Sequence, residues 1–165
     1  MTRKEGIRMY HSLIFQYDSN GSVATRNTWD NWHLIPSTRP VVSQPTVNYK
    51  FVDVPGRDGS LDFSTYLTGK PSYSDRTGSF SFYVVNESET GQSYGDWATR
   101  KSAIARVLNG RKVMKMILED DPNYYYIGRF YMKDWQPGEH FSTLTIEYRV
   151  DPYKYAISDD SAVIG

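Results

Sequence analysis

Strict alternation of apolar and polar residues over short segments most constrains the fold of this chain. The clearest segment is 143–150, in which every second residue is apolar: Leu144, Ile146, Tyr148 and Val150. Side chains two residues apart lie on the same face of a β-strand, so this pattern predicts a strand with one buried and one exposed face. The same period predicts a strand at 47–51, with Val47, Tyr49 and Phe51 on its buried face, and another at 78–86, with Phe80, Phe82 and Val84 inward.

Turn-forming residues separate these segments. Asn20-Gly21 is a hairpin signal because both residues tolerate positive φ, and Pro-Gly, Asp-Pro and Gly-rich clusters recur along the chain. Further strands are predicted at 11–17, 112–119 and 124–132. Pro36, Pro40 and Pro45 lack an amide donor, so the segment that contains them is expected to be an edge strand or an arm that lies on a neighbour.

A helix is predicted at about 94–109. Trp97, Ile104 and Leu108 form an apolar stripe at helical spacing, Arg100 is expected on the solvent side, and Ser93 with Asp96 resembles a capping box. Many strands and one helix predict a mainly β (α+β) fold, an antiparallel β-sandwich with one packed helix. We expect one domain at 1–155 and a short tail at 156–165, with no second domain.

Composition argues against most chemistry. The chain has no cysteine and only three histidines, which are not at metal-ligand spacing, so we expect no metal and no cofactor. We find no credible catalytic triad or phosphate loop and expect no enzyme activity. Nineteen basic and nineteen acidic residues cancel, which disfavours nucleic-acid binding, and we expect neither a signal peptide nor a membrane span.

Aromatic residues are abundant, with fourteen tyrosines and four tryptophans. Half-buried strands of a β-sheet select such residues, and so do protein interfaces. Both explanations stay open. A third explanation is a sugar-stacking platform, which would make the chain a carbohydrate-binding module; its residues would be Trp29, Trp32, Tyr124, Tyr125 and Tyr126.

Several motifs, in order and spacing, make residues 27–155 resemble the N-terminal domain of siphophage distal tail proteins. They are NTWDNWHLIP (27–36), VPGRDGSLD (54–62), YSDRTGSF (73–80), LNGRK at the helix end (108–112), DDPNYYYIGR (120–129) and DPYKY (151–155). The resemblance implies a β-sandwich with a flanking helix and an extended β-arm, assembled as a hexameric ring. That ring joins the tail tube to the tail-tip or receptor-binding apparatus.

The resemblance also implies partners and a location. The partners would be copies of the same chain, the tail-tube protein and a tail-tip or receptor-binding protein, in a virion tail made in a bacterial host's cytoplasm. DNA would pass without specific binding, which suits the zero net charge. Candidate subunit-interface residues are Pro40, Val42, Pro45, Arg57, Asp58, Tyr66, Tyr124 and Tyr125.

One feature and one alternative qualify this expectation. Many relatives carry a second, C-terminal domain, sometimes sugar-binding, whereas ten residues follow Tyr155 here. We therefore expect a minimal ring-forming adaptor without direct carbohydrate recognition. A tail-tube or baseplate-hub subunit is the nearest alternative, since such proteins share related sandwich cores.

Overall fold

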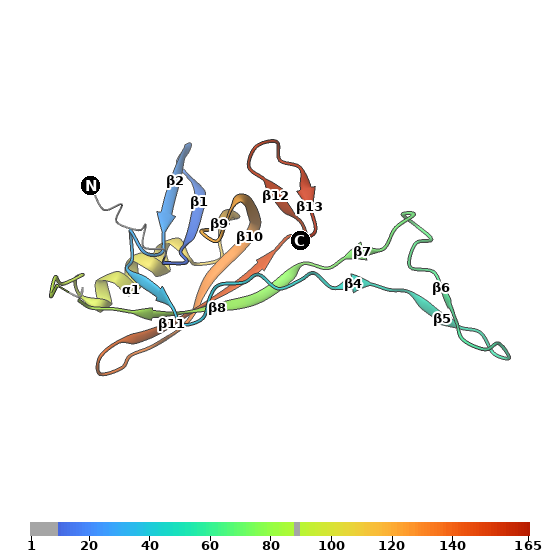
Figure 1. The fold of residues 1–165 in the computed structure, drawn as a ribbon, viewed down its shortest axis with the longest axis horizontal. Coiled ribbons are helices and arrows are strands. Elements are labelled where there is room, and N and C mark those ends of the chain that lie inside the picture. Colours follow the sequence, from blue (N-terminus) through green and yellow to red (C-terminus); the bar gives the residue numbers. More distant parts are fainter. Residues whose placement is uncertain (1–9, 88–89) are drawn as a thin grey trace, which may run out of the picture.

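The computed structural model describes residues 10–87 and 90–165, which form a β-rich body from which a long arm extends (Figure 1). The elements in chain order are β1 (Leu13–Ser19), β2 (Ser22–Asn27), β3 (Leu34–Pro36), β4 (Val47–Asn48), β5 (Phe51–Asp53), β6 (Ser60–Asp62), β7 (Ser72–Tyr73), β8 (Arg76–Val84), α1 (Trp97–Val107), β9 (Met114–Leu118), β10 (Asp121–Gln136), β11 (Ser142–Val150), β12 (Lys154–Ala156) and β13 (Ala162–Val163).

The body is one antiparallel sheet in the order β2-β1-β9-β10-β11-β8-β3, to which β12 and β13 are added beside β10. The two ends of this order, β2 and β3, are joined by only the six residues 28–33. The sheet therefore has to curl until its edges approach. Aromatic packing agrees with this curling, because the ring centres of Phe15 on β1 and of Trp32, just before β3, lie 6.4 Å apart. The mainly β, antiparallel fold with a packed helix is confirmed; its layers are formed by a single curled sheet.

The alternation of the long strands is realised as expected. On β11 the side chains of Leu144, Ile146, Tyr148 and Val150 are all buried. They face one core together with residues from β1, β3, β8, β9, β10 and α1. The β1–β2 hairpin turns at Asn20 and Gly21, whose φ values are 55° and 85°. Pro36 lies on β3, which is an edge strand bonded only to β8.

The helix is shorter than predicted, and its inner face differs. Ile104 and Leu108 are buried as expected, but the predicted position of Arg100 on the solvent side is wrong. Arg100 is 8% exposed and donates a hydrogen bond from Nη1 to the Val85 carbonyl oxygen at 2.6 Å. The expected capping box is absent, since the Asp96 N-cap makes no side-chain cap bond and Ser93 Oγ accepts from the Gly95 amide.

The arm consists of residues 47–73, with the small sheets β4–β7 and β5–β6 along its length (Figure 1). The expected strand at 47–51 is split between β4 and β5. Its predicted buried face is wrong, because Tyr49 is 63% and Phe51 57% exposed. Among residues 10–87 and 90–165 no layer covers that part of the arm, so alternation there does not correspond to burial.

The C-terminal residues continue the fold. Strand β12 pairs with β10, and β13 pairs with β12, so the expected boundary at residue 155 falls inside a small hairpin. One of the Asp-Pro turn signals, Asp121-Pro122, lies within a strand instead, because β10 begins at Asp121. Within residues 10–87 and 90–165, no helix combines the length and apolar character needed to cross a bilayer.

Candidate interaction site

The arm carries the densest set of uncovered apolar side chains in the described structure. Seven large apolar residues of the arm are at least one-third exposed: Tyr49, Phe51, Val52, Val54, Phe63, Tyr66 and Leu67. Leu67 and Tyr66 are the most exposed of these, at 91% and 77%. Contiguous exposed apolar surface typically marks a site of protein–protein contact.

The arm has a defined local structure, although it lacks a core. The tip turns at Gly56 and Gly59, whose φ values of 80° and 75° strain any residue with a side chain. Lys50 N–H donates to Ser64 Oγ at 2.8 Å, which joins the outgoing and returning chains. The rings of Phe63 and Tyr66 meet edge to face at 5.9 Å. These contacts present the apolar side chains on an ordered scaffold.

A buried arginine fixes the base of the arm. Arg76, 1% exposed, donates from Nε to the Pro152 carbonyl at 2.9 Å and from Nη1 to the carbonyls of Ser43 and Gly165. Its guanidinium also lies 5.4 Å from the centre of the Tyr126 ring. Arg76, at the start of β8, therefore links the segment that enters the arm, through Ser43, to the C-terminal region, through Pro152 and Gly165. Sequence reasoning missed it, because nothing in the pattern separates a buried arginine from a surface one.

The segment that enters the arm runs along β8. Ser37 N–H donates to the Ser81 carbonyl at 2.9 Å, and Ser43 Oγ donates to the Thr77 carbonyl at 2.8 Å. Pro40, Val42 and Pro45, all predicted interface residues, are buried within this chain. Their side chains offer little surface to a neighbour, so an interface would have to use the exposed residues around them.

The remaining predicted interface residues fall into two groups. Arg57, Asp58 and Tyr66 are exposed on the arm, the first two in the tip turn 54–59 and Tyr66 in the loop 63–70. Tyr124 is half-buried and Tyr125 is 8% exposed, and both lie against the C-terminal hairpin. The structure thus places the first three on the arm and the two tyrosines beside the C-terminal hairpin.

The hairpin holds Tyr124 and Tyr125 by polar contacts. Lys154 Nζ lies 4.4 Å from the Tyr124 ring centre, and the Tyr125 hydroxyl donates to Asp160 Oδ1 at 2.7 Å. That hydrogen bond is the largest cause that raises the pKa of Tyr125 to about 12. Tyr155 stacks on Tyr125 at 5.5 Å. These tyrosines serve internal packing.

The sugar-stacking platform is not formed. Trp32, Tyr125 and Tyr126 are all buried, while Trp29 stacks on Tyr10 with ring centres 3.9 Å apart. A flat, exposed array of five rings is therefore absent from the described residues. The acidic run 119–121 is used in local bonds: Glu119 accepts from the Ser12 amide at 2.6 Å, and Asp121 pairs with Lys154 at 2.8 Å. No cluster of potential metal ligands exists among the residues described.

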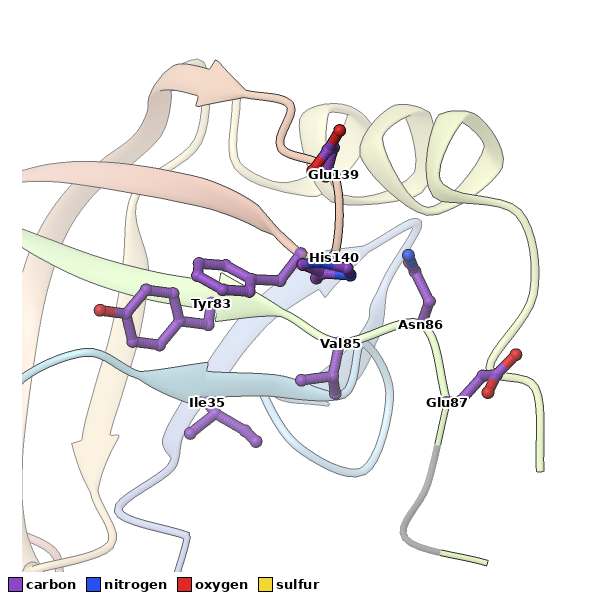
Figure 2. Close-up of a pocket in the computed structure, with 8 residues that line it drawn as sticks. Ile35, Tyr83, Val85, Asn86, Glu87, Glu139 and His140 are labelled. Atoms are coloured by element: carbon purple, nitrogen blue, oxygen red, sulfur yellow. The ribbon is translucent and has the colours of Figure 1, made fainter. Parts of the chain in front are cut away.

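An open groove of about 660 Å³ lies at the end of the body where β8 finishes (Figure 2). Its apolar lining is Ile35, Tyr83, Val85 and Phe141. Tyr83 and Phe141 meet edge to face at 4.8 Å and are 37% and 46% exposed. Glu87 and Glu139 also line it. The sequence analysis did not select this groove; its one signal was Tyr83, an aromatic residue on the otherwise serine-rich face of its strand.

Comparison with known proteins decides the family. The family model described as "Phage tail protein RIFT-related domain" matches residues 32–142, which is more than half of the chain. The chain belongs to this family. The resemblance to siphophage tail proteins is thereby confirmed, and the chain is a structural protein of a phage tail. The family is one of structural proteins and not of enzymes.

A solved structure shares the fold. The Dit protein (gp 19.1) of phage SPP1, described as a paradigm of the hub adsorption apparatus in phages that infect Gram-positive bacteria, matches with a TM-score of 0.57 and 20% identity. The match covers 87% of this chain and 52% of the SPP1 protein, so this chain spans about half the length of that relative. Among curated proteins, none matches the chain.

Proposed function

We propose that the protein is a distal tail adaptor, which forms a hexameric ring and joins the tail tube to the tail-tip or receptor-binding apparatus. The observation that carries this proposal is the arm, whose apolar side chains are uncovered in the single chain. A monomer would leave that surface in water, whereas a neighbouring copy would bury it. The fold shared with the SPP1 Dit protein supports the same role.

Ring closure follows from a contact between two different surfaces. A head-to-tail contact repeats from copy to copy and closes when its rotation divides a full turn. The arm extends from one end of the body, so the surface it meets on a neighbour lies on a different part of the molecule (Figure 1). We therefore propose the arm as the donor half of such a contact, with Arg57, Asp58 and Tyr66 among its contacting residues.

Light scattering after size-exclusion chromatography, with negative-stain electron microscopy, tests this proposal. Six chains of 19.1 kDa predict a particle of about 115 kDa with a central opening. A tail-tube subunit would instead extend into long cylinders, and a ring adaptor would stop at one or two rings. A protein that stays monomeric at high concentration, alone and mixed with the tail-tube and tail-tip proteins of the same phage, would contradict the proposal.

The neutral charge leads to a second, dependent proposal. A ring around a DNA passage needs a surface that does not retain the phosphate backbone, and the chain has no net charge. We expect filter binding at low salt to show weak, sequence-independent DNA affinity. Tight and strongly salt-dependent affinity would argue against a passage of this kind.

A further inference from the structure

The groove and the arm lie at opposite ends of one strand. The arm returns to the body at Arg76, where β8 begins, and the groove contains Tyr83 and Val85, where β8 ends. At about 3.3 Å per residue, the nine residues of β8 separate the two sites by roughly 25–30 Å. A projection at one end of a strand and a hollow at the other are the geometry that a head-to-tail contact requires.

The groove has the chemistry of a receptor for an apolar and cationic segment. Ile35, Tyr83 and Val85 line the strand side, while Glu139 lies on the loop between β10 and β11 and Glu87 at the end of the groove (Figure 2). Its volume is within the range of about 300–1,000 Å³ typical of ligand-binding clefts. An occupant would therefore bury apolar side chains on the strands and place a positive charge near the two carboxylates.

One segment of this chain has the matching chemistry. The loop 63–70 presents the two most exposed large apolar side chains of the arm, Tyr66 and Leu67, and Lys70 is its only charged residue. The loop is closed by a hydrogen bond from the Gly69 amide to the Thr65 carbonyl at 2.8 Å, which holds both apolar side chains outward. The tip turn at 54–59 is a poorer match, because its Arg57 and Asp58 cancel in charge.

We infer that the groove receives the loop 63–70 of a second copy, with Tyr66 and Leu67 against Tyr83 and Phe141 and with Lys70 toward Glu87 and Glu139. This inference rests on the proposed ring and identifies its acceptor surface. Aromatic and aliphatic side chains that enter a neighbour's cleft are the usual anchors of an interface. The two acidic residues provide charge complementarity at the edge of the contact, which fixes its orientation.

Two variants that each disable one half of the contact test the inference. Leu67→Asp removes the anchor and keeps the groove, whereas Phe141→Asp places a carboxylate in the groove and keeps the loop. Loss of an anchor at the centre of an interface weakens association by about 30-fold or more. Each variant alone is therefore expected to be monomeric at concentrations where the wild type assembles. Mixed in equal amounts, they should form a heterodimer, because one intact loop meets one intact groove.

Matched controls separate this effect from unfolding or loss of solubility. Val113→Asp and Val23→Asp change apolar residues that are 52% and 76% exposed on other surfaces, and both should assemble like the wild type. Each variant's circular dichroism melt should match that of the wild type. Lys70→Glu should weaken assembly, and Glu139→Lys added to it should restore much of the loss.

The outcomes distinguish the two proposals. A wild type that never oligomerises contradicts the adaptor function itself. A wild type that forms rings while Phe141→Asp does so equally well overturns only the assignment of the groove. The assignment of the groove is also overturned if the two variants are monomeric and their mixture stays monomeric. It is overturned as well if a glycan array shows that the wild type binds a sugar that Phe141→Asp no longer binds, while ring formation is unaffected.

Discussion

Replacing Gly128 by alanine should destabilise the body by forcing two strands apart. Gly128 lies on β10 opposite Val150 of β11 and Met114 of β9. A Cβ atom on this residue would lie 2.2 Å from the Arg149 carbonyl oxygen and 2.6 Å from the Val150 Cα. Both are backbone atoms, so no side-chain rotation relieves the contact, and the β10–β11 pair has to separate by about 1 Å to reach ordinary contact distance.

The magnitude follows from two opposing effects. Overpacking of this kind costs about 1–3 kcal/mol, and weakening the adjacent bond from the Asp151 amide to the Ile127 carbonyl, now 2.9 Å long, adds about 1 kcal/mol. Alanine is intrinsically better than glycine in a strand by about 0.5–1 kcal/mol, which offsets part of the loss. We expect a net loss of about 2 kcal/mol in the free energy of unfolding.

Urea unfolding followed by tryptophan fluorescence measures this loss, since Trp32 and Trp135 are both buried in the core. With a slope of about 2 kcal/mol per molar urea, the midpoint should fall by about 1 M. Ser79→Ala, at an exposed position of β8, is the control and should change stability by less than about 0.5 kcal/mol. A Gly128→Ala midpoint equal to that of this control would refute the reasoning.

Three further predictions concern buried and titrating groups. Burial lowers the pKa of His33, and the positive charge of nearby Arg100 lowers it further. The stability that depends on the neutral ring is therefore present above pH 6.5 and is lost as the pH falls through the lowered pKa of the folded state. In His33→Asn, whose asparagine tolerates the φ of 52°, the melting temperature should depend less on pH between about pH 7.5 and 5.5 than in the wild type. The hydrogen bond to Asp160 raises the pKa of Tyr125 from 10 to about 12, so the stability that this bond contributes is complete below pH 10 and is lost as the pH rises through 12. The unfolding midpoint of Tyr125→Phe should therefore fall less steeply than that of the wild type over this pH range, and an equally steep fall would contradict the assignment. Ile146→Ala, at a fully buried position, should cost about 2–5 kcal/mol in a calorimetric or chemical melt, and a loss below 1 kcal/mol would show that the core there is loosely packed.

The sequence was sufficient to predict the strands whose alternation corresponds to burial in this chain. The pattern of β11 and of Phe80, Phe82 and Val84 on β8 is realised residue by residue. The same alternation at Tyr49 and Phe51 gave a wrong prediction of burial. Period two shows that a strand has an apolar face, but it does not show whether the layer covering that face belongs to the same chain.

Part of the candidate site could be predicted, and the rest depends on distant segments meeting. Tyr66, Arg57 and Asp58, predicted as interface residues, are exposed on the arm, and their place in an interface stays a prediction. Arg76 and Arg100 could not be selected, since an arginine becomes buried only where carbonyl groups from remote segments converge on it. The groove joins β3, β8 and the β10–β11 loop, and no local pattern shows that they adjoin.

Arg76 anchors the base of the arm to the body. Its bonds to the carbonyls of Ser43 and Pro152 hold the chain at the point where the arm leaves the body. An arm anchored at its base has less orientational freedom to lose on docking than one attached through a free linker. In the proposed assembly, copies whose arms share one angle of approach repeat the same contact, and a shared angle is the condition for a closed ring of uniform size.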